Sequence, residues 1–304
     1  MPRAPALRVP RTEAEALRRA LIAEARLRTD LKPRREGDEV VFPVTDALPE
    51  EEFEAGGQAP RTYREMLDLP ADLAALLPSS FDVVGHVLLL KLPEPLLPHA
   101  RSIADALLAA NPPVRTVALD RGVKGEFRVR DLEVVAGERS TRTVHVEHGV
   151  RLVVDPATAY FSPRLATERA RVAAHVRPGE RVADLFAGVG PFAIVLAKLA
   201  RPARVDAVEW NPSAAQMLRE NVRRNRVDGV VVPHEDDARA WASRGENGGR
   251  FDRVVMNLPH GAHAFLEAAF GLVGEAGVVH HHVIASEAGL ARHLDEVEAR
   301  ARAV

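Results

Sequence analysis

The fold of this chain is decided by the stretch from Val182 to Phe192, VADLFAGVGPF. A short apolar strand ends at an acidic residue, Asp184, and a Gly-x-Gly turn leads from it into an apolar helix. Glycines let the backbone approach a ligand closely, and the start of the helix offers free N–H groups. Because Ala193 completes the relaxed dinucleotide pattern, the loop predicts an adenosine-bearing cofactor without separating NAD from the others.

Three further strands carry polar residues at or just past their carboxyl ends. Residues 205–209 end in Glu209, about 20 residues beyond the loop, where a carboxylate can accept both ribose hydroxyls. Residues 230–232 precede Asp236-Asp237, and residues 254–256 precede Asn257. Taken singly, each polar residue is also explained as a loop cap, a solvated strand end or a turn former. Together they indicate ligand binding above an open parallel sheet, and the pattern resembles the class I S-adenosylmethionine-dependent methyltransferases more than the dehydrogenases.

Length and composition bound the class of protein. A chain of 304 residues with 46% hydrophobic residues is expected to form two or three domains. No run approaches the roughly 18 apolar residues of a membrane span, and the N-terminus lacks an apolar signal core, so we expect a cytoplasmic protein without membrane contact. A net charge of -2 does not by itself indicate a nucleic-acid-binding protein, so local patches must carry any such role.

The chain contains no cysteine. Disulfides and thiolate zinc sites are therefore excluded. The thiol nucleophile that would attack a pyrimidine ring carbon is also missing, which disfavours covalent methylation of C5 in cytosine or uracil. A methyl acceptor that is already nucleophilic, such as a ring nitrogen, fits better.

The periodicity predicts three domains, residues 1–60, 61–155 and 156–304. The first is a small αβ domain with a helix over residues 12–27, opened by a capping box at Thr12 and Glu15, a strand over 39–43, and an acidic linker over 50–57. The last is doubly wound: a helix over 162–176 precedes strand–helix units that end with a strand over 278–284 and a helix over 287–303.

The middle domain is predicted to be α+β. A strand over residues 81–92 is apolar enough to be buried on both faces, and a helix over 99–110 follows it. Four strands are then expected over 114–119, 126–135, 141–147 and 151–154. By the period of two, the second of these places Arg128 and Arg130 on one face.

Two clusters of side chains are candidate functional sites. Arg164, Glu168 and Arg171 share one helix face, which from spacing alone favours a surface salt-bridge ladder. The run His280-His281-His282 suggests a metal site, but successive strand residues point to alternate faces and cannot all bind one ion. We therefore interpret the three histidines as structural.

Three motifs together resemble the archaeal and eukaryotic-type tRNA (guanine-N1)-methyltransferases. They are FSPRL with Glu168-Arg169 at residues 161–169, DLFAGVGPF at 184–192, and NLPH at 257–260. The resemblance covers nearly the whole chain, including the segment over residues 125–128. It implies a Rossmann-like class I methyltransferase domain preceded by an α+β domain and a small N-terminal αβ domain. The family methylates N1 of the guanosine immediately 3′ of the tRNA anticodon, position 37.

The resemblance also implies roles for individual residues. The catalytic set is Glu168 as the general base, Arg128 to stabilise charge on guanine O6, with Arg130 as the fallback, and Asn257 to hold the guanine edge. S-adenosylmethionine would be held by Asp184, Phe186, Gly188, Gly190, Glu209, Asn211, Asp237 and Asn257, with Glu209 on the ribose and Asp237 on the adenine amine. The substrate contacts would come from Tyr160, which stacks on the extruded base, and from Arg164, Arg130 and Pro259. The partner is tRNA, no metal is required, and a monomer is expected.

Two features depart from the general pattern of class I methyltransferases. His260 stands where exocyclic-amine methyltransferases often carry an aromatic residue, which makes an adenine-N6 acceptor less attractive. The two strands that normally follow the fifth helix are missing after residue 303, so we expect residues 278–284 to form an unpaired edge. Two other functions stay open: a wyosine-pathway tRNA transferase, acting by aminocarboxypropyl transfer or by methylating a tricyclic guanosine, and a catalytically idle RNA-binding relative.

Overall fold

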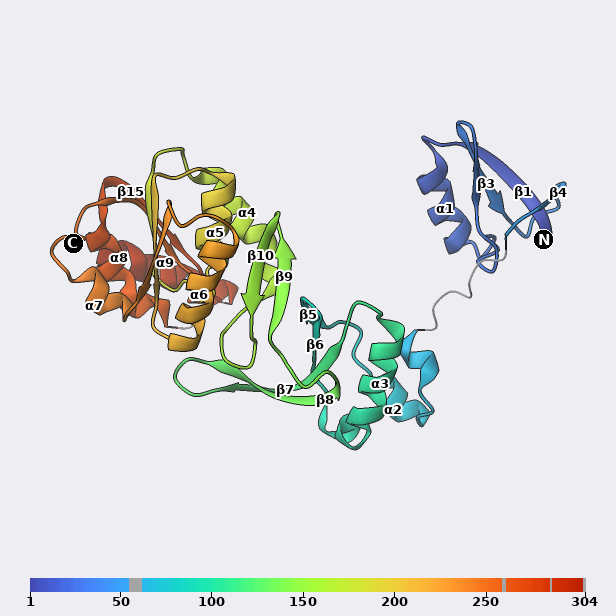
Figure 1. The fold of residues 1–304 in the computed structure, drawn as a ribbon, viewed down its shortest axis with the longest axis horizontal. Helices are drawn as coiled ribbons and strands as arrows, with labels where there is room; N and C mark the ends of the chain where they lie inside the picture. The colour runs from blue at the N-terminus through green and yellow to red at the C-terminus, as the bar shows by residue number, and fades with distance from the viewer. Residues whose placement is uncertain (55–61, 259–260, 285, 303–304) are drawn as a thin grey trace. The chain divides into compact units, whose positions relative to one another are not determined.

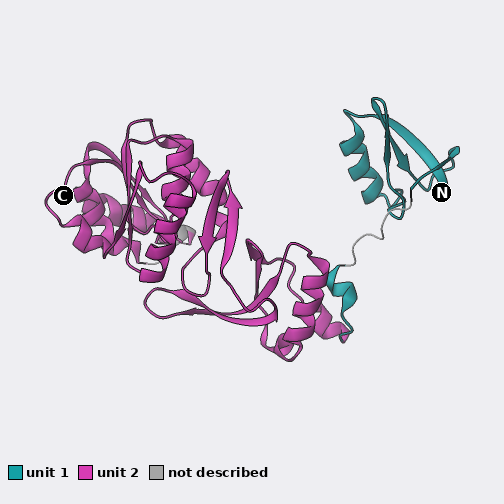
Figure 2. Cartoon of the chain, viewed as in Figure 1, with its two compact units in different colours: residues 1–69 teal, residues 70–304 magenta. Residues whose placement is uncertain are grey.

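The computed structural model describes residues 1–54, 62–258, 261–284 and 286–302. The chain divides into two compact units, Met1–Leu69 and Pro70–Val304 (Figure 2). The first boundary lies close to the predicted one at residue 60, and the predicted division of the second unit at residue 155 stays a prediction. Among the described helices, none combines the length and the apolar character that a membrane crossing requires.

The first unit packs one helix on a four-stranded sheet in the order β2-β3-β1-β4. Its elements are β1 (Arg3–Pro10), α1 (Ala14–Ala23), β2 (Arg34–Glu36), β3 (Glu39–Pro43), β4 (Glu50–Glu52) and the 3-10 helix η1 (Tyr63–Met66) (Figure 1). The strand expected over 39–43 is confirmed as β3. The buried side chain of Leu21 on α1 packs with Phe42 and Val44, which closes the small core.

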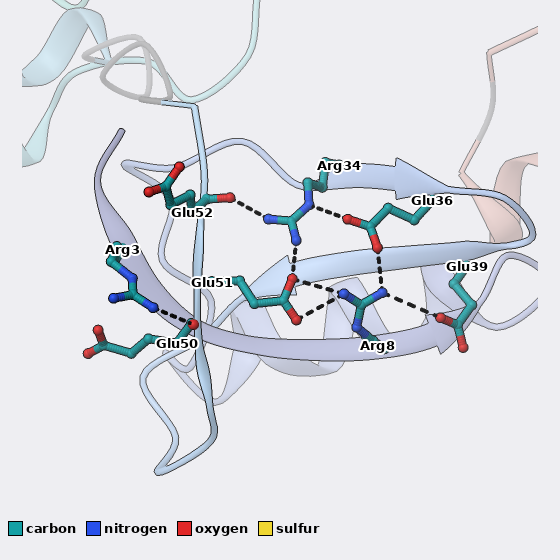
Figure 3. Close-up of polar contacts among 8 residues, drawn as sticks. All are labelled: Arg3, Arg8, Arg34, Glu36, Glu39, Glu50, Glu51 and Glu52. Atoms are coloured by element: carbon teal, nitrogen blue, oxygen red, sulfur yellow. Dashed lines mark hydrogen bonds and ion pairs between the residues drawn. The ribbon is translucent and has the colours of Figure 1, made fainter.

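The acidic segment over residues 50–57 was predicted to be a linker. The prediction is wrong for its first three residues, which form β4 and pair with β1. Figure 3 shows the reason. Glu51 accepts hydrogen bonds from Arg8, at 2.9 Å, and from Arg34, so two guanidinium groups neutralise it. Glu36 accepts from the same two arginines, at 2.5 and 2.7 Å. An acidic strand is therefore stable here because arginines from β1 and β2 lie beside it.

The predicted capping box at Thr12 is also wrong. The helix begins at Ala14, and its N-cap is Glu13, which makes no side-chain cap hydrogen bond. Residues 11–13 form a turn, so Thr12 lies too far before the helix to cap it.

The second unit begins with an α+β part whose sheet has the order β5-β6-β7-β8. Its elements are α2 (Ala71–Ala75), β5 (Asp82–Val84), β6 (Val87–Leu90), the 3-10 helix η2 (Glu94–His99), α3 (Ala100–Ala110), β7 (Thr116–Lys124) and β8 (Val129–Gly137), followed by the hairpin β9 (Thr143–Glu147) and β10 (Val150–Val154). The predicted helix over 99–110 is confirmed as α3.

The single strand expected over residues 81–92 is wrong, because the chain reverses at Gly85 and forms the antiparallel pair β5 and β6. Gly85 has a φ of +55°. A Cβ atom on it would lie 2.2 Å from Thr143 Oγ1 and 2.6 Å from the carbonyl oxygen of Val144, so no side chain fits. The apolar run therefore hides a tight turn that packs against β9.

The strand expected from residue 126 is also wrong at its start. Residues 125–128 form the turn between β7 and β8, and both Gly125 and Arg128 have positive φ values, +67° and +51°. Arg128 therefore lies exposed in the turn, while Arg130 lies on β8 and is mostly buried. The two arginines do not form the predicted pair on one strand face, because the alternation of strand residues begins only after Arg128.

The remaining elements form a parallel sheet in the order β13-β12-β11-β14-β15. They are the 3-10 helix η3 (Pro163–Leu165), α4 (Ala166–His175), β11 (Arg181–Asp184), α5 (Pro191–Leu199), β12 (Arg204–Glu209), α6 (Pro212–Arg224), β13 (Val231–Glu235), α7 (Ala238–Ala242), β14 (Phe251–Met256), the 3-10 helix η4 (Ala262–Phe265), α8 (Leu266–Leu272), β15 (Val273–His281) and α9 (Glu287–Ala301). The predicted doubly wound domain is confirmed. Within the described residues, β15 pairs with β14 alone.

Successive residues of the central strands enter two different cores. Val182 and Val255 pack with α4, α5 and α6, whereas Ala183 and Val254 pack with α7 and α8 on the opposite face. Figure 1 shows these helices covering the two faces of the sheet. Strands buried on both faces read as continuous apolar runs, which is why the sequence revealed them.

Two buried asparagines fasten the hairpin strand β10 to α6. The Asn221 side chain accepts from the N–H of Val153, at 2.7 Å, and donates to the carbonyl oxygens of Val153 and Val189, both at 2.9 Å. One turn later, Asn225 exchanges the same pair of bonds with Arg151, at 2.9 Å each. The two side chains thus satisfy the backbone of β10 on the edge where no strand within the described residues pairs with it.

Candidate active site

The two glycines of the loop after β11 are required for different reasons. Gly190 has a φ of +89°, and a Cβ atom on it would lie 2.5 Å from the side chain of Leu218 on α6. Gly188 has a φ of +56°, but its nearest neighbour would be the carbonyl oxygen of Tyr160 at 3.6 Å. Gly190 therefore allows the loop to pack on α6, while Gly188 is favoured by its backbone conformation, because a Cβ atom there would make only an ordinary contact.

Glu209, at the end of β12, holds the loop in place. One carboxylate oxygen accepts from the N–H of Gly188 and the other from the N–H of Asn211, both at 2.7 Å. Burial raises the pKa of Glu209, and these amide hydrogen bonds oppose the rise. Because a carboxylate oxygen has two lone pairs, each oxygen can still accept from a hydroxyl group, as the predicted ribose contact requires.

Asp184 is a carboxyl group buried at the end of β11. Its two oxygens have no hydrogen-bond partner within the described residues. The amides of Phe186 and Ala193 lower its pKa without meeting the geometry of a hydrogen bond. Burial, and then the charge of Glu209, raise the pKa of Asp184 to about 7. Unpaired buried carboxyl oxygens are rare and indicate that a group outside the chain pairs with them.

Two predicted cofactor residues are N-caps of helices. Asn211 caps α6 by accepting from Ser213 at 3.0 Å, and it donates to the carbonyl oxygen of Thr158 at 2.7 Å. Asp237 caps α7, where a single carboxylate oxygen accepts from the N–H groups of residues 239 and 240 at 2.9 and 3.0 Å. The cofactor roles of both residues stay predictions. Asn211 already has a partner for its oxygen and for its nitrogen, whereas the second oxygen of Asp237 accepts no hydrogen bond from the described residues.

The predicted cofactor residue Phe186 lies against Phe265 in an edge-to-face contact, with ring centroids 4.9 Å apart. The guanidinium group of Arg239 covers the other ring at 4.2 Å from its centroid. Phe186 therefore belongs to an aromatic wall between β11 and η4.

Asn257 directly follows β14, and its side-chain oxygen is buried without a hydrogen-bond partner in the described part of the chain. A buried amide oxygen in that state can accept from a bound base. Pro259, which was predicted to contact the substrate, lies outside the described residues.

Glu168 on α4 is brought to the end of β15. Arg171 donates to its two carboxylate oxygens at 2.7 and 2.6 Å, and His282 Nε2 lies 2.8 Å from Oε1. The hydrogen bonds from Arg171, and then that from His282, outweigh partial burial and hold the pKa of Glu168 at about 2. The backbone N–H of His282 donates to the carbonyl oxygen of Met256 at 3.1 Å, next to Asn257. His282 therefore connects Glu168 to the end of β14, and the structural interpretation of the three histidines stays a prediction.

The predicted salt-bridge ladder forms only in part. Glu168 and Arg171 do pair, but Arg164 turns away from them and donates to Asp82 at 2.6 Å. Arg130 lies 3.6 Å from the same Asp82 and also pairs with Asp120. Two predicted substrate residues, Arg164 and Arg130, thus meet at one carboxylate of β5.

Arg169 anchors the segment that carries Tyr160. Its buried guanidinium group donates to both carboxylate oxygens of Glu147 at 2.6 Å and to the carbonyl oxygen of Ser162 at 3.2 Å. It also lies 5.3 Å from the ring centroid of Phe161. Tyr160 itself is 41% exposed, as a side chain that stacks on a base requires.

The turn that carries Arg128 contacts the residue that follows β12. Phe127 makes an edge-to-face contact with Trp210, with centroids 5.3 Å apart, and Trp210 is 51% exposed directly after Glu209. Arg128 forms no ion pair with any described residue. Trp210 is an additional candidate site residue, and its place immediately after the predicted ribose-binding carboxylate is the sequence signal that indicates it.

Three family models match the chain. The TRM5/TYW2 methyltransferase domain matches residues 143–304, more than half of the chain. The chain belongs to the TRM5/TYW2 methyltransferase family. The TYW2 N-terminal domain matches residues 63–141 of this TRM5/TYW2 protein, and the tRNA methyltransferase 5 N-terminal domain matches residues 6–53.

Known proteins resemble it along most of its length. The tRNA (guanine(37)-N(1))-methyltransferase Trm5b of Pyrococcus abyssi is 40% identical over 91% of this chain and 83% of the relative. The crystal structure of that Trm5b has a TM-score of 0.76 and 38% identity, covering 99% of this chain and 90% of its own. A solved complex of aTrm5 and tRNALeu has a TM-score of 0.71 and 32% identity, covering 96% and 90% of the two chains.

As a TRM5/TYW2 methyltransferase, the chain uses S-adenosylmethionine as its cofactor. The site fits this group, because Asp184 offers buried carboxyl oxygens without a hydrogen-bond partner among the described residues to a cationic ligand. Within the described residues, no group of three or more histidine and acidic side chains is arranged to hold a metal ion.

Proposed function

We propose that this TRM5/TYW2 enzyme transfers a methyl group from S-adenosylmethionine to N1 of guanosine 37 in tRNA. One observation carries the proposal. The ionised carboxylate of Glu168 and the unpaired amide oxygen of Asn257 come to the same end of the sheet, linked through His282 and Met256. An acceptor for the N1 proton and a group that can read the guanine edge are therefore supplied together.

The chemistry requires a proton acceptor. Guanine N1 carries a proton with a pKa of roughly 9, and this proton must leave as the bond from N1 to the methyl carbon forms. S-adenosylmethionine supplies the electrophilic methyl group when it is bound. As N1 loses electron density to the new bond, its proton becomes far more acidic, so even a carboxylate with a pKa of about 2 can accept it. Glu168 then releases the proton to water.

Arg128 is the arginine that we assign to guanine O6. While the N1–H bond breaks, electron density shifts onto O6 of the same ring amide, and a guanidinium group stabilises that density. Arg128 is exposed and free of ion pairs within the described residues, whereas Arg130 is already paired with Asp120 and Asp82. The contact of Phe127 with Trp210 would hold the turn in position.

The remaining assignments follow the same site. Glu209 would hold the cofactor ribose, Asp237 the adenine amine and Asp184 the ammonium group, while Tyr160 would stack on the extruded base. We propose that residues 1–60 contact tRNA away from the anticodon loop. The monomeric state and the cytoplasmic location stay predictions, and light scattering of the purified chain tests the first.

The proposal is tested by incubating the full chain with labelled S-adenosylmethionine and an unmodified tRNA transcript. We expect one methyl group per tRNA, recovered as N1-methylguanosine, and no transfer when guanosine 37 is replaced by adenosine. Equal labelling of both transcripts would contradict it. The match to a TYW2 N-terminal domain supports a second candidate, a wyosine-pathway transferase. Transfer only to tRNA that carries a tricyclic base at position 37 would favour that candidate, and no transfer at all would favour an idle RNA-binding relative.

A further inference from the structure

His282 lies where four elements of the methyltransferase domain meet. It directly follows β15, and its backbone N–H bonds to Met256 at the end of β14. Its ring lies 5.4 Å from the ring of Phe192 on α5, and its Nε2 atom lies 2.8 Å from Glu168 Oε1 on α4. The imidazole side chain is only 15% exposed. A polar side chain in this position bridges α4 and the sheet directly.

The direction of the hydrogen bond is fixed by chemistry. A carboxylate only accepts, so the Nε2 atom of His282 carries the proton and donates it to Glu168. The other partner of Glu168 is Arg171, three residues away on the same helix and 55% exposed. The pair with Arg171 therefore fixes the position of the carboxylate only relative to α4. The bond from His282 is the contact that relates the carboxylate to the sheet, and hence to Asn257.

We infer that His282 is a positioning residue for methyl transfer, which holds the Glu168 carboxylate at the distance from Asn257 that one guanine needs. This inference rests on the proposed function, because it requires Glu168 to act as the base. Misplacing a reacting group by about 1 Å can lower a rate on the order of 100-fold. Without His282, the carboxylate follows Arg171 and its own helix.

Two substitutions separate the hydrogen bond from the packing. His282→Phe keeps a ring against Phe192 but loses the bond to Glu168 and the 3.4 Å contact of Nδ1 with the carbonyl oxygen of Met256, whereas His282→Gln places an amide N–H near the position of Nε2. In single-turnover assays with the full chain and a tRNA transcript, we expect His282→Phe to lower the rate of transfer about 10- to 100-fold. His282→Gln should recover to within about fivefold of wild type. The dissociation constants for S-adenosylmethionine and tRNA should change less than about twofold in both variants.

A matched control is His281→Phe. The His281 side chain pairs with His293 instead, at 2.9 Å between the Nε2 atoms, so its loss should leave the rate within about threefold. A wild-type rate in His282→Phe would overturn the inference. So would an equal loss in His281→Phe, or a His282→Gln variant as slow as His282→Phe.

A double-mutant cycle tests whether His282 acts through Glu168. In a Glu168→Gln background, His282→Phe should cause less than about a twofold further loss, because the carboxylate that it positions is already gone. Multiplicative losses would overturn the inference while leaving the proposed function standing. If Glu168→Gln alone keeps the wild-type rate, the proposed base has failed, and the inference fails with it for that separate reason.

Discussion

Asp184→Asn should make the cofactor-free protein more stable. In the folded chain the carboxyl group is fully buried, has no hydrogen-bond partner within the described residues, and its pKa is raised from 3.8 to about 7. At about 1.4 kcal/mol for each tenfold change in acidity, ionising this group in the fold costs roughly 4 kcal/mol. Asparagine has nearly the same shape and carries no charge, so it removes this cost.

The sign of the pH dependence follows from the raised pKa. Between 3.8 and about 7 the folded protein keeps a proton that the unfolded chain has lost, so the free energy of unfolding of the wild type falls as the pH rises. The variant lacks this decrease. The difference in unfolding free energy, variant minus wild type, should therefore grow by roughly 3 kcal/mol between pH 5 and pH 8.

The assay is denaturant unfolding followed by tryptophan fluorescence. The two tryptophans of the chain, Trp210 and Trp241, both lie in the second unit, so the signal reports on the domain that contains Asp184. The variant should bind S-adenosylmethionine roughly 10- to 100-fold more weakly than wild type by calorimetry, because a charge-assisted hydrogen bond is lost. A variant that is no more stable than wild type at pH 8, or that binds the cofactor equally well, would refute the reasoning.

Three further substitutions test the supports of the site. Asn221→Leu leaves a buried N–H and two carbonyl groups unpaired, and we expect a loss of about 3 kcal/mol in denaturant unfolding with cofactor affinity unchanged in the folded fraction. Arg169→Met removes both short hydrogen bonds to the buried carboxylate of Glu147, which keeps the 3.5 Å contact with His145, and should cost about 3–5 kcal/mol, which thermal unfolding would show. Phe127→Ala removes its contact with Trp210, worth about 1 kcal/mol, and should slow methyl transfer several-fold; an unchanged single-turnover rate would argue that the Arg128 turn needs no such support.

The methyltransferase sheet was predictable because each of its strands carries a local signal. Residues such as Val182 and Ala183 face different cores, so the strands appear as uninterrupted apolar runs. Their polar residues follow the strand ends, and parallel strands bring such ends to one edge of the sheet. Asp184, Glu209 and Asn257 could therefore be placed at one edge of the sheet before any coordinates.

The errors came from contacts between distant parts of the chain. The acidic β4 strand is stable because Arg8 and Arg34 neutralise it, and no window around residue 50 contains that information. The error at Arg128 has a local cause instead. This residue has a positive φ, and nothing in the sequence marks a non-glycine residue that adopts this backbone conformation. The alternation of polar and apolar residues from residue 126 therefore predicted a strand across the turn over residues 125–128.

The partner of Glu168 was hidden for the same reason as the pairing of β4. His282 is 114 residues away in the sequence, and only the parallel pairing of β14 with β15 brings it to α4. Strand alternation places His281, which pairs with His293 on α9, on the opposite face from His280, which lies beside His175 on α4. It could not show that one of those faces meets the carboxylate predicted to act as the base.

The central claim, that Glu168 accepts the N1 proton, is tested most directly by the single-turnover rate of Glu168→Gln at neutral pH. Glutamine keeps the size of the side chain and cannot accept the proton as a carboxylate does. We expect methyl transfer to guanosine 37 to slow roughly 100- to 10,000-fold, while the dissociation constant for S-adenosylmethionine stays within about twofold of wild type. A variant that transfers the methyl group at the wild-type rate would contradict the account and leave Glu168 as the surface partner of Arg171.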